Sequence, residues 1–150
     1  INKLENYGIR GVVKNWFKSY LQNRKQMVDI RGVLSEQNYI TCGVPQGSIL
    51  GPILFLLYIN DIKNSSTIIK FFLFADDTST FLTGKTIDEI EEKYNSELEN
   101  VVKWLNANKL SLNVDKSNVV VFSKNRQRNI RPIKLKINKE NIEETEFTNY

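Results

Sequence analysis

The sequence contains no histidine and only one cysteine, Cys42, among its 150 residues. With a single thiol, the chain can form neither an internal disulfide nor a cysteine zinc site. The lack of histidine also excludes every Ser-His or Cys-His mechanism and most other transition-metal sites. Any metal ion that binds this chain is therefore a hard cation with oxygen ligands.

Long apolar runs are also absent. The longest, residues 49–59, is interrupted by Gly51 and Pro52 and is shorter than the roughly 20 residues that cross a bilayer. It predicts a buried core helix. The hydrophobic content of 41% is sufficient for one domain with a core. Because the sequence has no initiator methionine and no charged-then-apolar leader, we interpret it as an excised piece whose targeting cannot be read.

The formal net charge of +4 is modest, but the charges are unevenly distributed. Residues 1–31 are rich in lysine and arginine, and residues 88–99 are acidic. A second basic run follows, with Lys124, Arg126, Arg128 and Arg131. Two basic segments suit a polyanion such as nucleic acid, although solvated surface faces have the same composition.

The apolar pattern predicts an α+β fold. The order of elements is mixed rather than a regular βαβ alternation, so we expect helices packed on one face of a mainly antiparallel sheet. Helical periodicity and strand-like runs place the elements along the chain. Helices are expected at residues 11–22, 49–62 and 86–107, and strands at residues 27–30, 39–40, 68–74, 78–82, 119–122 and 133–137.

Composition also predicts burial and capping. The 49–62 helix is apolar on nearly every face and should be surrounded by protein on most sides, with Ser48 capping its start. The β-branched run 119–122 should be buried on both faces. Thr86 and Glu89 have capping-box spacing. Four aromatic residues at helical spacing are expected to pack in the core rather than to stack on bases: Trp16, Phe17, Tyr20 and Trp104.

Asp76 and Asp77 lie side by side in "LFADDTST", between two predicted strands that should form a hairpin. Adjacent carboxylates repel each other unless a cation or hydrogen bonds compensate their charge. Mg²⁺ resolves this conflict, because it takes one or two carboxylates together with substrate phosphate oxygens. An ordinary turn is the alternative interpretation, since aspartate is common in turns.

The stretch "GVPQGS" places Pro45 between Gly43 and Gly47, and Ser48 follows at the head of the apolar helix. A loop of this kind can approach the backbone of a ligand closely, and its free amide groups favour a phosphate at the helix start. A plain glycine-proline turn is again the alternative. The loop and the aspartate pair together are far more specific than either one alone.

The long stretch "GVPQGSILGPILFLLYINDI" followed by "LFADDT" resembles the reverse transcriptases of non-LTR retrotransposons, the LINE-like elements. Upstream "YGIRGVVKNWFKSYLQNRKQMVDIRG" and downstream "WLNANKLSLNVDKSNVVVFS" are similar to the same family. The resemblance covers about residues 4–123 in the same order. It implies a palm-like fold and an RNA-directed DNA polymerase that extends a primer on an RNA template by two-metal nucleotidyl transfer.

This resemblance also implies the site residues and their partners. Asp76 and Asp77 stand where the family binds Mg²⁺, with Mn²⁺ as a substitute. Lys116 aligns with a lysine that protonates the leaving pyrophosphate, although a solvated loop lysine is an equal alternative. The expected partners are an RNA template, a DNA primer, deoxynucleoside triphosphates and, in cis, an endonuclease and other domains, with no membrane. The nucleotide- and template-binding residues implied are Gly43, Pro45, Gln46, Gly47, Ser48, Ala75 and Phe74, where many relatives have tyrosine.

The sequence also departs from the family. Nothing resembles its first metal-binding aspartate, its fingers or its thumb, and "EFTNY" at residues 146–150 looks like a truncated primer grip. We therefore expect a partial reverse transcriptase domain over residues 1–150, with a palm core at about 25–123 and a basic segment at 124–150. The fragment alone should be inactive. The alternative is a catalytically dead retroelement remnant that at most binds nucleic acid; the family itself implies the nucleus or a cytoplasmic ribonucleoprotein.

Overall fold

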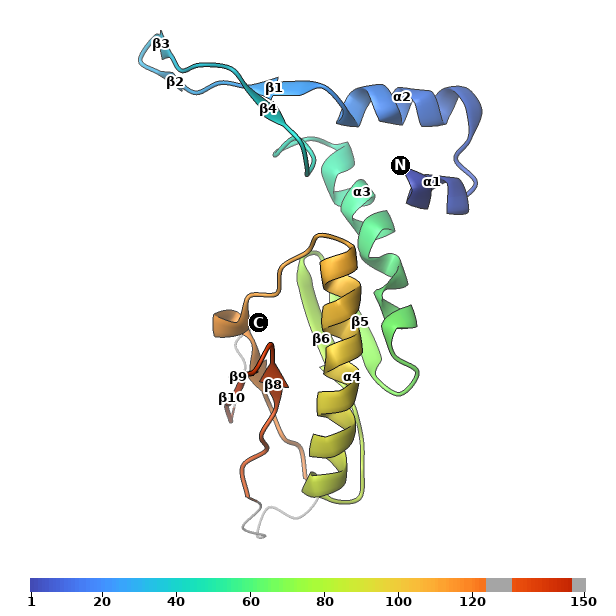
Figure 1. Cartoon of the computed structure of the whole chain (residues 1–150), viewed down its shortest axis with the longest axis vertical. Helices are drawn as coiled ribbons and strands as arrows, with labels where there is room; N and C mark the ends of the chain where they lie inside the picture. The colour runs from blue at the N-terminus through green and yellow to red at the C-terminus, as the bar shows by residue number, and fades with distance from the viewer. Residues whose placement is uncertain (124–130, 147–150) are drawn as a thin grey trace. The chain divides into compact units, whose positions relative to one another are not determined.

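The computed structural model describes residues 1–123 and 131–146 (Figure 1). The chain divides into two compact units, Ile1–Asn60 and Asp61–Tyr150, and each is described by itself. The predictions for Lys124, Arg126 and Arg128, and those for residues 147–150, lie outside the described residues. Among the described residues, no helix is both long enough and apolar enough to cross a membrane.

The N-terminal unit contains three helices and a long two-stranded arm. Helix α2 confirms the amphipathic helix expected at residues 11–22, and it ends where Gln22 turns extended and Asn23 adopts φ +56°. Lys3 of α1 donates to the backbone oxygen of Tyr58 in α3 at 2.7 Å, which joins the first and last helices. The bounds are α1 Asn2–Asn6, α2 Gly11–Leu21, β1 Arg24–Gln26, β2 Asp29–Ile30, β3 Val33–Leu34, β4 Asn38–Ile40 and α3 Leu50–Ile59.

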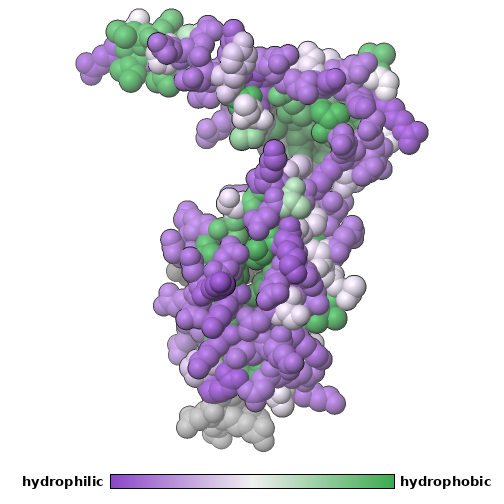
Figure 2. Space-filling view, viewed as in Figure 1, coloured by the Kyte–Doolittle hydropathy of each residue, from purple (hydrophilic) through white to green (hydrophobic). Residues whose placement is uncertain are grey.

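The arm is a hairpin in two sections, because β1 pairs with β4 and β2 pairs with β3, both antiparallel. The Asp29 carboxylate accepts a hydrogen bond from the Gly32 amide at 2.9 Å, and Gly32 adopts φ +84°, so the turn closes tightly. The strand expected at residues 27–30 is therefore shorter, and β3 lies where a loop was expected. Apolar side chains gather at the end of the arm (Figure 2), where Ile30, Val33 and Leu34 are mostly exposed.

Helix α3 is less buried than its composition predicts. Gly51, Leu54 and Ile59 are buried, whereas Ile53 is 53% exposed and Leu56 is 49% exposed. The expectation of protein on most sides is wrong for the described residues, because composition reports an apolar surface but not what covers it. Trp16 on α2 behaves in the same way: it is 53% exposed and stacks on Tyr20, with 5.5 Å between ring centroids, instead of packing in a core.

The C-terminal unit combines one long helix with short strands. In the described part of the whole chain, the strands form five separate two-stranded sheets, of which only the β7–β10 pair is parallel. Mixed helices and small antiparallel sheets agree with the α+β prediction, but residues 1–123 and 131–146 form no single sheet, because most of their strands are only two or three residues long. The elements are β5 Lys70–Phe74, β6 Asp77–Phe81, α4 Ile87–Ala107, β7 Asn118–Val119, β8 Lys136–Ile137, β9 Glu140–Asn141 and β10 Glu143–Glu144, with 3₁₀ turns η1 at Asn60–Ser65 and η2 at Val114–Lys116.

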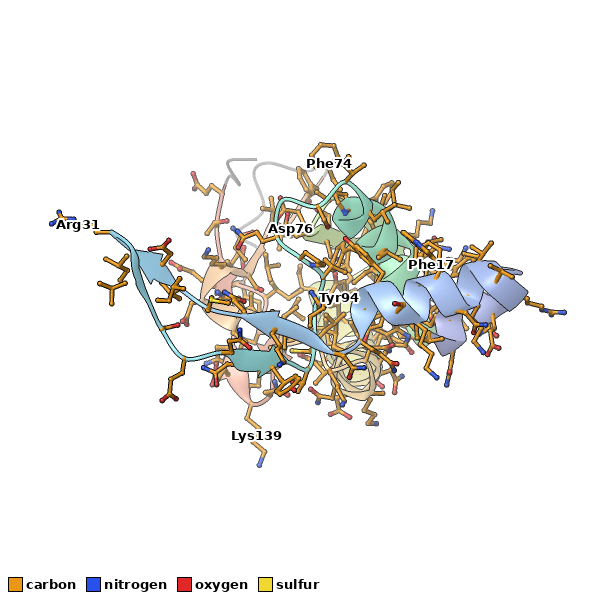
Figure 3. All side chains as sticks on the ribbon, turned by 90° about the horizontal axis from the view of Figure 1, so that it is seen from above. Phe17, Arg31, Phe74, Asp76, Tyr94 and Lys139 are labelled. Atoms are coloured by element: carbon orange, nitrogen blue, oxygen red, sulfur yellow. The ribbon has the colours of Figure 1, made fainter. Side chains whose placement is uncertain are left out.

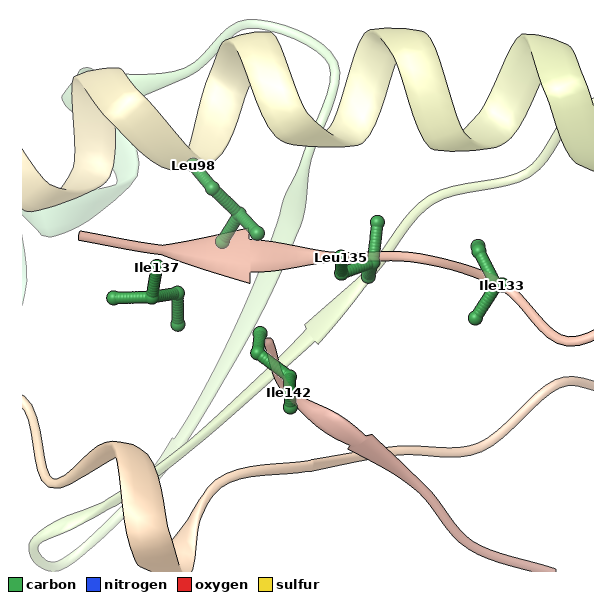
Figure 4. Packing of buried hydrophobic residues seen from close by; sticks show 5 residues of the cluster. All are labelled: Leu98, Ile133, Leu135, Ile137 and Ile142. Carbon is green, nitrogen blue, oxygen red and sulfur yellow. The ribbon is translucent and has the colours of Figure 1, made fainter. Parts of the chain in front are cut away.

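Helix α4 organises the core of this unit. It begins at the predicted cap, where the Thr86 hydroxyl accepts a hydrogen bond from the Glu89 amide at 3.2 Å. The Glu89 carboxylate accepts from the Lys85 amide at 3.0 Å, one residue earlier than in a full capping box. The core cluster then packs against α4 (Figure 4) and consists of Leu98, Ile133, Leu135, Ile137 and Ile142.

Two strand predictions in this unit need correction. Strand pairing in the expected 133–137 segment is limited to β8, although the alternating burial of Ile133, Leu135 and Ile137 is that of a strand. Of the expected 119–122 strand, only Val119 belongs to a strand, β7, and Phe122 is 81% exposed rather than buried. The reason is the partner: β7 pairs with β10, which is itself only two residues long, so the ladder stops.

Candidate active-site hairpin and glycine loop

The two aspartates lie at the turn of a tight hairpin, as the sequence predicts. Strands β5 and β6 pair antiparallel over their full length, with Phe74 directly opposite Asp77. Ala75 and Asp76 form the two-residue turn, and Ala75 adopts φ +50°. Asp76 is therefore a turn residue, whereas Asp77 is the first residue of β6. Figure 3 labels Phe74 and Asp76 at this end of the hairpin.

The hairpin has a covered face and an open face. On the covered face, the Thr80 hydroxyl and the Tyr94 hydroxyl of α4 are 2.5 Å apart. On the open face, Phe72 and Phe81 make an edge-to-face contact at 5.1 Å and are 59% and 47% exposed. Because directly opposed residues share a face, Asp77 lies with Phe74 on this open side.

Both aspartate side chains are exposed, and the only metal-ligand atoms that they supply are oxygens. Among residues 1–123 and 131–146, no group of three or more histidine, cysteine or acidic side chains comes together to hold a metal ion. Two carboxylates fit part of the octahedral shell of Mg²⁺, whose remaining ligands are commonly water and substrate phosphate. The residues present therefore fit a hard cation but do not enclose it.

The glycine loop lies in the N-terminal unit, directly before α3. Gly43 and Gly47 both adopt φ +76°, a conformation that is strained for residues with a Cβ. The Ser48 amide donates to the Pro45 oxygen at 3.2 Å, and the Ser48 hydroxyl accepts from the Gly51 amide at 3.1 Å. Ser48 thus caps the first turn of α3, as predicted. The Gln46 side chain is exposed to solvent.

Arg24 holds the start of this loop, a role that sequence reasoning missed. Its guanidinium donates to the backbone oxygens of Cys42 at 3.3 Å and Gly43 at 2.5 Å. The two oxygens belong to residues 18 and 19 positions further along the chain, so no local pattern signals the contact. In the first turn of α3, a Cβ on Gly51 would lie 3.0 Å from the Ser48 hydroxyl oxygen, so a larger residue there would have to displace the Ser48 side chain slightly.

Lys116 lies in the η2 turn of the C-terminal unit and is exposed. Its amide donates to the Asn113 side-chain oxygen at 3.3 Å, which fixes the turn but not the ammonium group. Asp76, Asp77, Lys116, Phe74 and Ala75 belong to the C-terminal unit, whereas the loop residues Gly43 to Ser48 belong to the N-terminal unit. The sequence motifs together predict that this loop and the aspartates face one cleft, and that stays a prediction, because the two groups belong to different units.

Tyr94 is the second residue that sequence reasoning missed, because the helical periodicity that predicts a helix at residues 86–107 does not indicate a polar contact for its hydroxyl. Burial raises the pKa of its hydroxyl, and the hydrogen bond with Thr80 opposes that shift. A neutral hydroxyl therefore joins α4 to β6, three residues from Asp77.

Comparison with known proteins identifies the family of the chain. The model of the family described as reverse transcriptase (RNA-dependent DNA polymerase) matches residues 1–147. The probable RNA-directed DNA polymerase from transposon X-element of Drosophila melanogaster is 30% identical over 114 residues, which cover 73% of this chain and 13% of that protein. The RNA-directed DNA polymerase from mobile element jockey of Drosophila funebris is 28% identical, over 71% of this chain and 12% of that protein.

The chain belongs to the reverse transcriptase family, which confirms the resemblance read from its motifs. A Pol polyprotein from the type-1 retrotransposable element R1 2 of Nasonia vitripennis is 41% identical over a shorter stretch of 64 residues. No solved structure matches the chain. The chain spans only about an eighth of the X-element and jockey polymerases that it matches.

Proposed function

We propose that this chain is the part of an RNA-directed DNA polymerase that carries two of its metal-binding aspartates. The observation that supports this most directly is the hairpin turn with Asp76 and Asp77 in a chain of the reverse transcriptase family. The proposed substrates are deoxynucleoside triphosphates, a DNA primer and an RNA template. The palm core spans about residues 25–123, and residues 124–150 lead toward a primer grip.

In this proposal, Asp76 and Asp77 hold Mg²⁺, or Mn²⁺ as a substitute. Such ions, when bound, activate the primer 3′-hydroxyl and stabilise charge on the leaving pyrophosphate. The remaining residues position the substrates: the Gly43–Ser48 loop, together with Phe74 and Ala75, contacts the incoming nucleotide and the template. Lys116 gives a proton to the pyrophosphate.

The proposal includes the inactivity of residues 1–150 alone. Two exposed carboxylates, without a third ligand among the described residues, bind Mg²⁺ weakly and position a triphosphate poorly. The exposed apolar residues at the start of α3 and within it, such as Ile49 at 90% and Ile53 at 53%, also support a larger protein whose other parts cover them. An endonuclease and further domains in cis complete the proposed protein.

Primer extension by the parent protein on an RNA template tests the metal role. Asp76→Asn should abolish Mg²⁺-dependent synthesis, because an amide keeps the shape of the side chain but removes the charge that holds the ion. RNA binding should persist, since phosphate contacts do not depend on this carboxylate. Glu92→Gln, which removes one exposed charge from α4, is the control and should leave synthesis unchanged.

Two outcomes would contradict the proposal. Undiminished synthesis by the Asp76→Asn protein would exclude the metal role. A parent protein that binds RNA but never extends a primer would favour the alternative, a catalytically dead retroelement remnant that acts as a nucleic-acid-binding module.

A further inference from the structure

We propose that a lysine-lined groove between α4 and the β8–β9 hairpin binds the phosphate backbone of single-stranded nucleic acid. The choice of nucleic acid as partner rests on the proposed function. The groove has a volume of about 600 Å³ and lies entirely within the C-terminal unit. Its floor is formed by Leu98, Val102 and Ile137, and its lysines are Lys103, Lys134, Lys136 and Lys139.

The strand segment presents two of these lysines on one side. Ile133, Leu135 and Ile137 are buried, so the alternation of a strand turns Lys134 and Lys136 outward together. Two residues of strand advance about 6.6 Å, so their side chains leave the backbone at that spacing. Neighbouring phosphates can therefore be contacted by neighbouring lysines.

Asn95 of α4 holds this segment in place. Its side-chain nitrogen donates to the Lys134 oxygen at 3.0 Å, and its side-chain oxygen accepts from the Lys136 amide at 2.9 Å. The side-chain amide thus replaces a neighbouring strand along this edge. Both lysines consequently project from a backbone that is fixed to a long helix, which lowers the entropy lost when they bind a ligand.

The other two lysines extend the rim. Asn138 and Lys139 form the two-residue turn between β8 and β9, and both have positive φ, 51° and 72°. Figure 3 shows the Lys139 side chain extending away from the ribbon. Lys103 is exposed on α4 and lines the same groove. The four cations therefore come from a helix, a strand segment and a turn.

The charge balance of the groove favours a polyanion. Of its two carboxylates, Glu91 is paired with Arg131 at 2.7 Å and accepts the Lys134 amide at 3.0 Å, and these hydrogen bonds lower its pKa. The charge of Glu91 is thus compensated, and Glu99 is the one groove carboxylate whose charge is not compensated in this way. Among the described residues, none of the four lysine ammonium groups forms an ion pair. The cations exceed the uncompensated carboxylate, and phosphate oxygens are the complementary ligand.

The floor determines the type of binding. Its side chains are aliphatic rather than aromatic, so the groove provides no platform for base stacking. Affinity should come from phosphate contacts and depend little on sequence. That the basic run 124–131 contacts phosphates stays a prediction, because Arg131 is the part of it that the structure describes, and its guanidinium pairs with Asp88 and Glu91.

Fluorescence anisotropy with a labelled, mixed-sequence 20-nucleotide single-stranded RNA tests the groove in the 150-residue chain. The variant Lys103→Gln, Lys134→Gln, Lys136→Gln, Lys139→Gln should weaken binding at least about tenfold at 0.1 M salt. The slope of log affinity against log salt should fall by about 3, since each lost phosphate contact removes about 0.7 on a single strand.

A matched variant separates the groove from total charge. Lys63→Gln, Lys70→Gln, Lys85→Gln, Lys109→Gln removes four exposed lysines outside the groove and gives the same formal net charge, 4 − 4 = 0. It should keep at least most of the affinity and the original slope. Replacing the four groove lysines by arginine should preserve binding. Lys139→Gln alone, at an exposed turn, should lower the slope by about 0.7 even if the fourfold variant fails to fold.

Several outcomes would overturn the inference: equal weakening by both fourfold variants, unchanged binding by the groove variant, or no RNA binding by the wild-type chain. The same variants can be tested for binding of poly-glutamate. If the groove variant lost poly-glutamate binding but kept RNA binding, the groove would be assigned to an acidic protein segment instead. None of these measurements involves Asp76 or primer extension, so failure here leaves the proposed polymerase function to its own test.

Discussion

At the scale of single residues, the candidate site depends on contacts that link distant parts of the chain. Arg24 binds the oxygens at the start of the glycine loop, and Tyr94 joins α4 to the strand that begins with Asp77. Neither side chain contributes a group to the proposed chemistry. Each instead restricts the backbone that carries such groups, so their effects should appear first in stability.

Tyr94→Phe should lower the free energy of unfolding by about 1 kcal/mol, because it removes one hydrogen bond and leaves the Thr80 hydroxyl without that partner. Urea denaturation measures this change. Tyr39→Phe is the control, since Tyr39 is 67% exposed, and it should have little effect. An equal loss in both variants would mean that the Tyr94–Thr80 contact does not stabilise the unit.

Because of the same hydroxyl, we expect the free energy of unfolding to depend on pH. Burial raises the folded-state pKa of Tyr94 above its ordinary value of 10.0, so the folded chain keeps the proton over a range in which the unfolded chain has lost it. This contribution to stability is complete below pH 10 and is lost as pH rises above it. Urea denaturation from pH 8 to 11 should therefore show a steeper loss for the wild type than for Tyr94→Phe; parallel curves would contradict the assignment.

At the scale of elements, the periodic patterns of the sequence predicted correctly those helices and strands that depend on neighbouring residues. The helical periodicity of residues 86–107 predicted α4, and the strand-like runs on both sides of Asp76 and Asp77 predicted the β5–β6 hairpin, because both depend on neighbouring residues. Burial of α3 and the length of β7 were predicted wrongly, since they depend on which distant segment lies alongside. For the same reason, the aspartate turn and the Ser48 cap were predicted, but the Arg24 and Tyr94 contacts were not.

Leu135→Ala tests the packing of the 133–137 segment on α4. Leu135 is 2% exposed, and the truncation should lower the free energy of unfolding by about 3 kcal/mol through lost burial and the cavity left behind. Phe122→Ala is the matched control: the residue lies in a predicted strand but is 81% exposed, so the cost should be below about 0.5 kcal/mol. Thermal or urea unfolding decides, and a large loss for Phe122→Ala would restore the predicted buried strand.

At the scale of the whole molecule, the chain has two units, and the residues assigned to one site are divided between them. The family relation extends across both units, because the family model matches residues 1–147. The chain also amounts to only about an eighth of the X-element and jockey polymerases that it matches. The activity of a complete site is therefore a proposal about a longer protein, whereas folding and weak binding can be measured on this chain.

Metal removal illustrates that difference. With two exposed carboxylates and no third ligand among the described residues, the 150-residue chain should gain less than about 0.5 kcal/mol from ~10 mM Mg²⁺, as expected when the dissociation constant is similar or weaker. Thermal unfolding in MgCl₂ and in EDTA should give nearly the same midpoint. A large shift that Asp76→Asn removes would show that the aspartate pair binds the ion strongly without further ligands.

Cys42 gives the molecule a built-in attachment point for a reporter group. It is the only thiol in the chain, it is exposed, and it immediately precedes Gly43 at the start of the glycine loop. A maleimide dye or a nitroxide spin label will therefore react at one position without any engineered substitution. Because the backbone oxygen of Cys42 is held by Arg24, the label reports the motion of the loop from an anchored base. Spectroscopy on the wild-type chain can thus follow the loop directly as nucleotide or RNA is added.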